Sequence, residues 1–262
     1  MMKSTAMYPN KRAMMGFSAD IPTSAGHRPD SVRSQRASAS RALVLASRSP
    51  RREQLLANSG YTFEVLVPDV DDSHLHRGAV DPDMWVQALA YFKAMASAHM
   101  INPSMSVFDQ PIPRTANTLD ALHTRPPVVL GADTVCVQNN VMLGKPANAD
   151  EAHSMMRAFS GASHDVLTGV ALLDLDTQSR VMFTGHSRVY FDVLSEAAID
   201  AYVASNAWQG KAGAYNLAER LDDGWNIDID GDPTNVVGLP MERVRVELAL
   251  LGVRPARAEQ ST

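Results

Sequence analysis

The sequence predicts an α/β fold with a mixed, twisted sheet and flanking helices. Segments with strand and helix patterns alternate in the first half of the expected folded part, which is typical of parallel strands joined by helices. In the second half, the apolar residues 166–173 and 180–191 follow one another across a short polar turn, which predicts an antiparallel hairpin. Together these patterns favour a mixed sheet over a purely parallel one.

Strands are expected where short apolar or alternating runs are bounded by Gly, Ser, Asn or Asp. In chain order these runs are residues 43–46, 61–67, 128–130, 135–137, 141–143, 166–173 and 180–191. Asp133 falls between two of them and is expected to end or interrupt a hydrophobic strand. Residues 225–237 are expected to form further short strands around turns.

Helices are expected where apolar residues recur at a spacing of three or four. In chain order these segments are residues 51–58, 82–100, 151–159, 196–205 and 241–251. Ser49, Asp150 and Ser195 are the expected N-caps, because their side-chain oxygens can accept unpaired backbone N–H groups. Pro50 stands at a first helical position, where no N–H is needed, and Gly60 is expected to end that helix.

One folded domain is expected over residues 41–255. Residues 1–40 are rich in Ser, Arg and Met, contain two acidic residues and show no apolar period, so we expect a disordered leader. A transit peptide and a misplaced start codon are the alternatives. Residues 102–127 lack any period and are interpreted as a surface insertion, and residues 256–262 as a tail.

Composition limits the classes of function. The formal net charge of −5 argues against nucleic acid as the main partner, because nucleic-acid-binding proteins carry an excess of basic residues. Cys136 is the single cysteine, which excludes an internal disulfide and a cysteine-based zinc site, and we expect a packed core thiol. No apolar run is long enough to cross a bilayer, so we expect a cytoplasmic protein with no membrane partner.

Residues 47–52, Ser-Arg-Ser-Pro-Arg-Arg, predict a site for a polyphosphate. They join an apolar strand to a helix N-terminus, where backbone N–H groups and the helix dipole favour anions. Arg51 and Arg52 are unfavourable in the first helical turn unless an anion is present. Forked guanidinium groups match phosphate oxygens well. The alternative is a solvated helix start that is basic by chance.

Other charged residues are ambiguous when each is considered alone. Asp133 is either a turn residue bonded to its own backbone or a carboxylate that activates water or holds a metal. Lys145 lies in a turn from which it could reach a phosphate, and Lys93 lies on a helix; both could equally be solvated. Asp71 and Asp72 form an acidic loop that suits Mg²⁺, although such pairs are commonly only hydrated.

Several familiar catalytic motifs are absent from the sequence. It contains no Walker Gly-Lys-Ser/Thr loop, no Gly-x-Gly-x-x-Gly fingerprint, no His-Glu-x-x-His and no Gly-x-Ser-x-Gly elbow. What remains is a set of cations and acids on different loops of one α/β core. Such a set suits cleavage of a metal-bound phosphoanhydride, in which cations neutralise the phosphates and an acid directs water.

Several motifs in order resemble those of the Maf family of nucleoside triphosphate pyrophosphatases, also called septum-formation inhibitors. The matching segments are Leu45–Arg52, Gly131–Thr134, Leu143–Pro146, Phe159–His164 with Thr168–Val170, Lys211–Tyr215 and Asn235–Pro240. The resemblance implies a mixed α/β fold shared with inosine-triphosphate pyrophosphatases, with two lobes around a cleft. It also implies hydrolysis of a nucleoside triphosphate to monophosphate and pyrophosphate, with Mg²⁺ or Mn²⁺, in a homodimer that clears modified or surplus nucleotides.

The same resemblance implies roles for individual residues. Asp133 would accept the proton of the attacking water and contact the metal, and Asp72 would take the family's acidic metal-associated position. The residues that would hold the triphosphate are Ser47, Arg51, Arg52, Lys93 and Lys145.

One position departs from the family pattern. In the branch that prefers dTTP and UTP, a Gln stands where this chain has Ala218. The branch acting on 7-methyl-GTP has a Glu-Arg pair near this point, like Glu219 and Arg220 here, but its Asp motif differs from residues 131–134. The preferred base therefore stays open.

An enzyme is the first expectation, and a regulator is the second. A nucleotide-binding regulator of cell division would act through binding, with hydrolysis incidental. A pure sensor would not need Asp133, so the charged set favours the pyrophosphatase.

Overall fold

The computed structural model describes residues 40–69, 75, 77–103 and 125–256. Nearly all of the expected leader and tail, most of the expected insertion, and Asp72 lie outside these residues. The domain boundaries therefore stay a prediction. None of the helices in the described ranges is long and apolar enough to cross a membrane.

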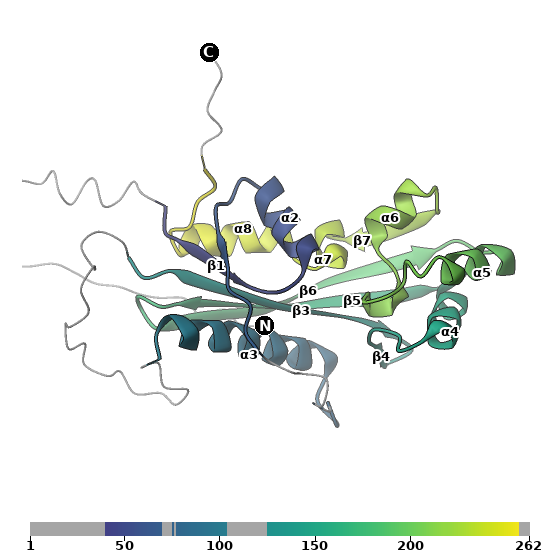
Figure 1. Cartoon of the computed structure of the whole chain (residues 1–262), viewed down its shortest axis with the longest axis horizontal. Coiled ribbons are helices and arrows are strands. Elements are labelled where there is room, and N and C mark those ends of the chain that lie inside the picture. Colours follow the sequence, from purple (N-terminus) through teal and green to yellow (C-terminus); the bar gives the residue numbers. More distant parts are fainter. Residues whose placement is uncertain (1–39, 70–74, 76, 104–124, 257–262) are drawn as a thin grey trace, which may run out of the picture. The chain divides into compact units, whose positions relative to one another are not determined.

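The described strands form one mixed sheet of seven strands (Figure 1). They are β1 (Leu43–Ala46), β2 (Glu64–Val65), β3 (Val128–Gln138), β4 (Val141–Leu143), β5 (Ser163–Asp174), β6 (Ser179–Phe191) and β7 (Ile227–Gly231). The order is β2-β1-β3-β5-β6-β7, with β4 also on β3. β1 is parallel to both of its neighbours, and the remaining pairs are antiparallel. The mixed α/β fold and the long hairpin, β5–β6, are confirmed.

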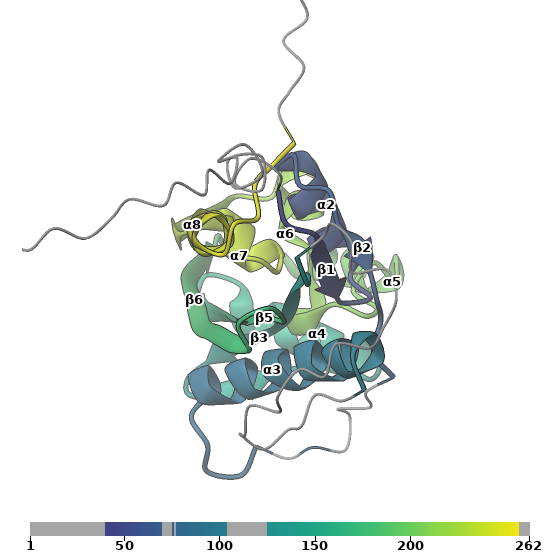
Figure 2. The same ribbon diagram turned by 90° about the vertical axis from the view of Figure 1, so that its left-hand side faces the viewer.

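Helices cover both faces of this sheet (Figures 1 and 2). They are α2 (Pro50–Asn58), α3 (Pro82–Ile101), α4 (Ala149–Phe159), α5 (Glu196–Ala204), the short 3₁₀ turn η1 (Ala212–Ala214), α6 (Leu217–Asp222), α7 (Pro233–Val237) and α8 (Met241–Leu250). α3 lies along one face, and α2, α7 and α8 lie on the other.

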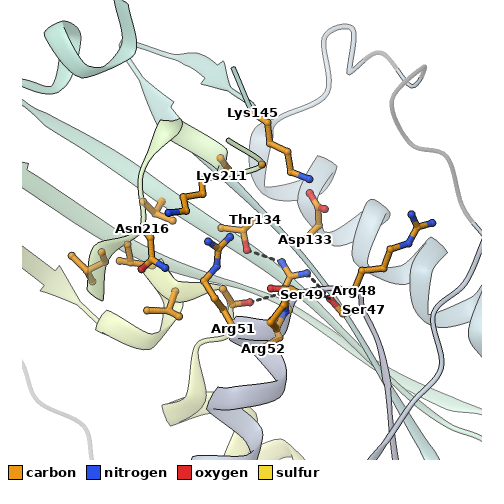
Figure 3. Close-up of a pocket in the computed structure, with 18 of the residues that line it drawn as sticks. Ser47, Arg48, Ser49, Arg51, Arg52, Asp133, Thr134, Lys145, Lys211 and Asn216 are labelled. Carbon is orange, nitrogen blue, oxygen red and sulfur yellow. Dashed lines mark hydrogen bonds between the residues drawn. The ribbon is translucent and has the colours of Figure 1, made fainter. Parts of the chain in front are cut away.

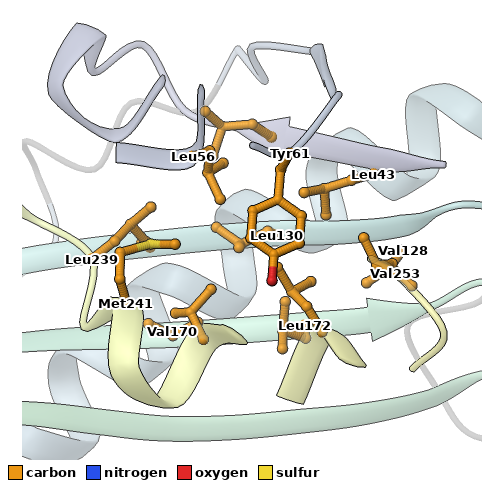
Figure 4. Packing of buried hydrophobic residues seen from close by; sticks show 14 of the residues in the cluster. Leu43, Leu56, Tyr61, Val128, Leu130, Val170, Leu172, Leu239, Met241 and Val253 are labelled. Carbon is orange, nitrogen blue, oxygen red and sulfur yellow. The ribbon is translucent and has the colours of Figure 1, made fainter. Parts of the chain in front are cut away.

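Side chains of β1 alternate between two cores, because successive residues of a strand point to opposite faces. Leu43 and Leu45 join the core under α2 and α8, together with Leu56 and Leu248 (Figure 4). Val44 and Ala46 join the core under α3. Burial on both faces explains why this strand is apolar at every position.

α3 packs unusually close to the sheet because glycines face it. A Cβ at Gly131 on β3 would lie 2.3 Å from the carbonyl oxygen of Ala90, and one at Gly169 on β5 would lie 2.3 Å from that of Val86. Such distances are shorter than atoms tolerate, so glycine is required at both positions. The close approach brings the middle of α3, and with it Lys93, over β3.

Some expected elements differ in the structure. Asn148, not Asp150, caps α4 by accepting from Glu151 N–H, which is two residues earlier than expected. Residues 233–237 form a helix rather than strands, because Asp232 caps Thr234 N–H and Pro233 supplies the first helical φ. Ser49 has the extended backbone of an N-cap, but its side chain makes no capping bond.

Candidate active site

The candidate site is a cleft that begins where β1 ends. The last residue of β1 pairs with Gly131, whereas β3 continues to Gln138 and meets β4 only from Cys136 onward. Between these points no strand of the described residues pairs with this edge of β3. Ligand sites in α/β sheets favour such places beyond the carboxyl ends of strands. A cleft of about 730 Å³ lies there.

The lining of the cleft is strongly cationic (Figure 3). Among the described residues its charged members are Arg48, Arg51, Arg52, Lys93, Lys145 and Lys211 on the basic side and Asp69, Asp133 and Glu219 on the acidic side. These residues come from segments far apart in the chain. An excess of basic groups in a concave site attracts an anionic ligand, although the whole chain carries a formal net charge of −5.

Arg52 is held by three different segments. Its Nε donates to Gly238 O at 2.9 Å, Nη1 to Ser47 Oγ at 3.1 Å and Nη2 to Thr134 Oγ1 at 2.9 Å. Burial lowers the pKa of Arg52, and neighbouring Arg51 adds to this while Asp133 opposes it. The guanidinium stays charged at neutral pH, since its ordinary pKa is above 12.

Arg51 and Lys145 differ from Arg52 in their surroundings. Neither has a hydrogen-bond or ion-pair partner among the described residues, and both line the cleft. Figure 3 shows the Lys145 side chain extending toward Asp133. The Arg51 side chain lies between Asp133 and Lys211. Their charges are therefore available to a ligand.

Asp133 lies inside β3 and does not interrupt it, contrary to the sequence expectation. It is opposite Gly169 in the register of β3 and β5. Its Oδ1 accepts a hydrogen bond from Lys93 Nζ at 2.6 Å, and the two side chains are 15% and 19% exposed. The strand continues past this carboxylate because Lys93, brought close by α3, offsets the cost of placing a charge there.

The far end of the cleft contains a second charged group. Lys211, just before η1, forms an ion pair with Glu219 on α6, and Asn216 Nδ2 donates to the other oxygen of Glu219 at 3.0 Å. Arg220 stacks over Tyr202, with 4.3 Å to the ring centroid, and pairs with Asp223 at 2.8 Å. Its Nη2 also lies 3.9 Å from Glu219 Oε2, so this end of the cleft is linked to a buried arginine.

Two further polar groups near the cleft are not suited to nucleophilic chemistry. Burial raises the pKa of the Cys136 thiol to about 12, so it stays protonated at neutral pH. His164 is buried, stacks on Phe159 at 3.9 Å between ring centroids and bonds Tyr215 OH at 2.9 Å. Burial lowers the His164 pKa to about 4, and this side chain does not line the cleft.

Comparison with known proteins assigns the family. The model for the Maf family, described as "Maf-like protein", matches residues 42–251, which is most of the chain.

This chain belongs to the Maf family.

Three relatives illustrate the similarity. A protein of Pelotomaculum thermopropionicum named "dTTP/UTP pyrophosphatase" is 38% identical over 210 residues, covering 80% of this chain and 96% of its own length. Proteins with the same name from Geobacillus sp. strain WCH70 and Shewanella oneidensis are each 38% identical, covering 80% of this chain and 98% of their own length. Similarity therefore extends over nearly the whole of each relative.

Most of the residues predicted for a Maf site lie together. Those that line this cleft are Ser47, Arg51, Arg52, Lys93, Lys145 and Asp133. Asp72 lies outside the described residues. Sequence reasoning assigned no role to Lys211, Asn216 or Asp69, which also line the cleft. The matching segment 211–215 was a signal for Lys211, because a lysine beside small residues in a turn can face a ligand.

The residues of this Maf cleft fit a divalent cation such as Mg²⁺. No group of three His, Cys, Asp or Glu that could hold a metal exists in the described ranges. Mg²⁺ does not need one, since it commonly binds one or two carboxylates together with substrate phosphates and water. Asp133 and Asp69 both offer carboxylate oxygens to the cleft, which are the hard donors that Mg²⁺ prefers.

Proposed function

We propose that this protein hydrolyses a nucleoside triphosphate to the monophosphate and pyrophosphate, with dTTP and UTP as the first substrates to test. The observation that carries this proposal is the Asp133 carboxylate, which lies between the basic side chains of the cleft and keeps one oxygen without a bond to any described residue. The relatives named "dTTP/UTP pyrophosphatase" support the same reaction and the same first substrates. The cleft, at about 730 Å³, is large enough for a nucleotide.

The reaction is cleavage between the α and β phosphates. The oxygen of a water forms a bond to the α phosphorus, the bond to the bridging oxygen breaks, and pyrophosphate leaves. Asp133 accepts the proton of that water. The Lys93 bond fixes Oδ1 of this carboxylate, so Oδ2 is the acceptor available to the water.

The basic side chains have a separate task. Arg51, Arg52 and Lys145 neutralise the triphosphate and the charge that develops on the leaving pyrophosphate. Ser47 has a supporting role, because its hydroxyl accepts from Arg52 and from the Ser49 backbone N–H. These bonds shape the turn that precedes α2.

A divalent cation, Mg²⁺ or Mn²⁺, belongs to the proposal. Asp133 would hold it with oxygens of the substrate, and Asp72 is the second ligand that the family resemblance suggests. When bound, the cation would neutralise phosphate charge and polarise the phosphorus–oxygen bonds.

The base would lie at the end of the cleft formed by Lys211, Asn216 and Glu219. An ammonium donor beside a carboxylate acceptor suits a base edge with a carbonyl next to an N–H, as in thymine, uracil and guanine. Glu219 is 43% exposed and so remains accessible to a ligand. The pattern leaves both pyrimidine and guanine triphosphates in the substrate screen.

Partners and compartment are also proposed. We expect a cytoplasmic homodimer that binds neither nucleic acid nor membranes. Light scattering coupled to size exclusion would measure the mass, and a monomer at micromolar concentration would contradict the dimer.

The test is pyrophosphate release from dTTP, UTP, GTP and 7-methyl-GTP with Mg²⁺ or Mn²⁺. The wild type should release pyrophosphate from at least one of them, and Asp133→Asn should be slower by about 10²–10⁴-fold, the usual contribution of a general base. Asp200→Asn, which changes an exposed carboxylate on α5, is the matched control and should behave like wild type.

One result would favour the second candidate, a nucleotide-binding regulator of cell division. Wild type and Asp133→Asn would then bind nucleotide equally well and release no pyrophosphate. The full cationic lining alone would suit such a sensor, but Asp133 would have no task in it.

A further inference from the structure

A chain of hydroxyl groups connects Arg52 to the interior of the sheet. Thr134 on β3 lies directly opposite Thr168 on β5, and their hydroxyl oxygens are 3.0 Å apart. Thr168 Oγ1 donates to Asn235 O on α7 at 3.0 Å, and Arg52 Nη2 donates to Thr134 Oγ1 at 2.9 Å. Thr168 is fully buried and does not line the cleft.

The direction of every bond in this chain is determined. A guanidinium only donates and a carbonyl only accepts, so both ends are fixed. Thr168 has one hydroxyl hydrogen and gives it to Asn235 O, so Thr134 must donate to Thr168 and accept from Arg52. Hydrogen bonds that run in one direction polarise and strengthen one another.

The anchoring leaves part of the guanidinium for a ligand. Of its five N–H groups, one on Nε, one on Nη1 and one on Nη2 are bonded to protein. One N–H on each terminal nitrogen remains. A guanidinium that offers N–H groups on both terminal nitrogens can bind two phosphate oxygens at once, provided that it cannot rotate.

We propose that Thr168 is a positioning residue, which fixes the Arg52 guanidinium through Thr134 so that its remaining N–H groups face the triphosphate. This inference rests on the proposed function, because it assumes that the ligand is a nucleoside triphosphate. Thr168 touches no substrate. It acts by giving the Thr134 hydroxyl a fixed acceptor, so that the lone pair of Thr134 is always presented to Arg52.

The local structure separates this role from simple support of the fold. Asn235 O also accepts from Gly238 N–H at 3.0 Å, so removing the Thr168 hydroxyl does not leave that buried carbonyl without a partner. Valine has nearly the shape of threonine and fills the same space. Thr168→Val therefore removes mainly the acceptor of Thr134.

The test is the dissociation constant of dUTP with a methylene bridge between its α and β phosphates, which cannot be cleaved there, in Mg²⁺ buffer. Thr168→Val should weaken binding by about tenfold, the scale of one hydrogen bond to a charged group, and Thr168→Ser should restore it. In an Arg52→Lys background, Thr168→Val should cause no further weakening, because the group it positions is gone. Thr184→Val, the same change on β6 at a hydroxyl bonded to Gln87, should leave binding unchanged.

Thr134→Val cuts the same chain one hydroxyl nearer to Arg52 and provides an independent measurement. The proposal is wrong if Thr168→Val binds like wild type, or if it weakens binding equally with Arg52 and with Lys at position 52. Wild-type hydrolysis of a triphosphate combined with either result would contradict the positioning role alone. A wild type that neither binds nor cleaves any triphosphate would overturn the proposed function and this inference together.

Discussion

Two cation–carboxylate pairs on the same sheet have opposite surroundings. Arg41 and Asp174 are 3% and 5% exposed and meet through two bonds, of 2.7 and 2.8 Å. Arg41 also donates to the carbonyls of Leu251 and Pro126. Lys93 and Asp133 lie in the cleft and meet through a bond of 2.6 Å to one carboxylate oxygen.

The difference separates a pair that holds the fold from a pair for which we propose a role in the reaction. Asp174 uses Oδ1 and Oδ2 for Arg41 and also accepts from two backbone N–H groups, at Asp176 and Thr177. Both oxygens of Asp174 are therefore engaged within the fold. Asp133 keeps Oδ2 in a water-accessible cleft, so it can accept a proton. A buried pair with both carboxylate oxygens bonded indicates a structural role, and a pair in a cleft with one carboxylate oxygen unbonded is a candidate for chemistry.

The largest effect on stability is expected at the Arg41–Asp174 pair. Asp174→Asn would leave the buried Arg41 cation uncompensated and should lower the free energy of unfolding by about 3–5 kcal/mol, with little change in the hydrolysis rate of the folded protein. Urea denaturation measures this loss. A variant as stable as wild type would show that the two pairs do not differ in this way.

The pH dependence of that pair follows from its pKa. Burial alone would raise the pKa of Asp174, but the bonds from Arg41 and the two backbone N–H groups outweigh it and hold the pKa far below its ordinary value. A folded-state pKa below the unfolded one gives stability that is complete above about pH 4 and is lost as pH falls further.

His164 should produce an effect of intermediate size in a separate pH range. Burial lowers its pKa from about 6.5 to about 4, with a weak opposing effect of Asp165. Between pH 6.5 and pH 4, His164 therefore binds a proton in the unfolded chain but not in the folded chain. The free energy of unfolding should fall by about 3 kcal/mol as pH drops from 6.5 to 4.

Two variants check whether His164 causes this slope of the free energy of unfolding against pH. His164→Phe keeps the stacking on Phe159 and should flatten the slope between pH 6.5 and 4. His186→Gln, at an exposed ring, should keep it. An unchanged slope in His164→Phe would assign the pH dependence to other groups.

The smallest effect is expected from a cation that makes no bond to the fold. Arg51→Ala should weaken triphosphate binding by about 1–3 kcal/mol and leave stability unchanged, because Arg51 has no hydrogen-bond partner among the described residues. Titration with the methylene-bridged dUTP measures the change. Arg245→Ala, an exposed arginine bonded to Ser59, is the control. Equal binding by both variants would remove Arg51 from the site.

Much of the fold could be predicted from the sequence, because apolar residues recur at regular spacings in its long helices and strands. The β5–β6 hairpin and α3 were predicted from apolar spacing, and Ser195 was identified as the cap of α5. α6 and α7 were missed, since helices of six and five residues are too short to show a period.

The site was less predictable, because its bonds join distant parts of the chain. The motif at residues 47–52 predicted an anion site, but nothing local indicated that Arg52 would be fixed by Thr134 and Gly238. Asp133 was expected near a strand end. Its place inside β3 depends on Gly169 and on Lys93 from α3, and these tertiary contacts cannot be read from the segment itself.

The central claim is that the Lys93–Asp133 pair performs the chemistry. The most direct test is the rate of pyrophosphate release by Asp133→Asn, measured with its thermal unfolding midpoint beside those of Asp174→Asn. We predict a rate lower by about 10²–10⁴-fold with an unchanged midpoint for Asp133→Asn, and the reverse for Asp174→Asn. Pyrophosphate release at the wild-type rate by Asp133→Asn would contradict the account.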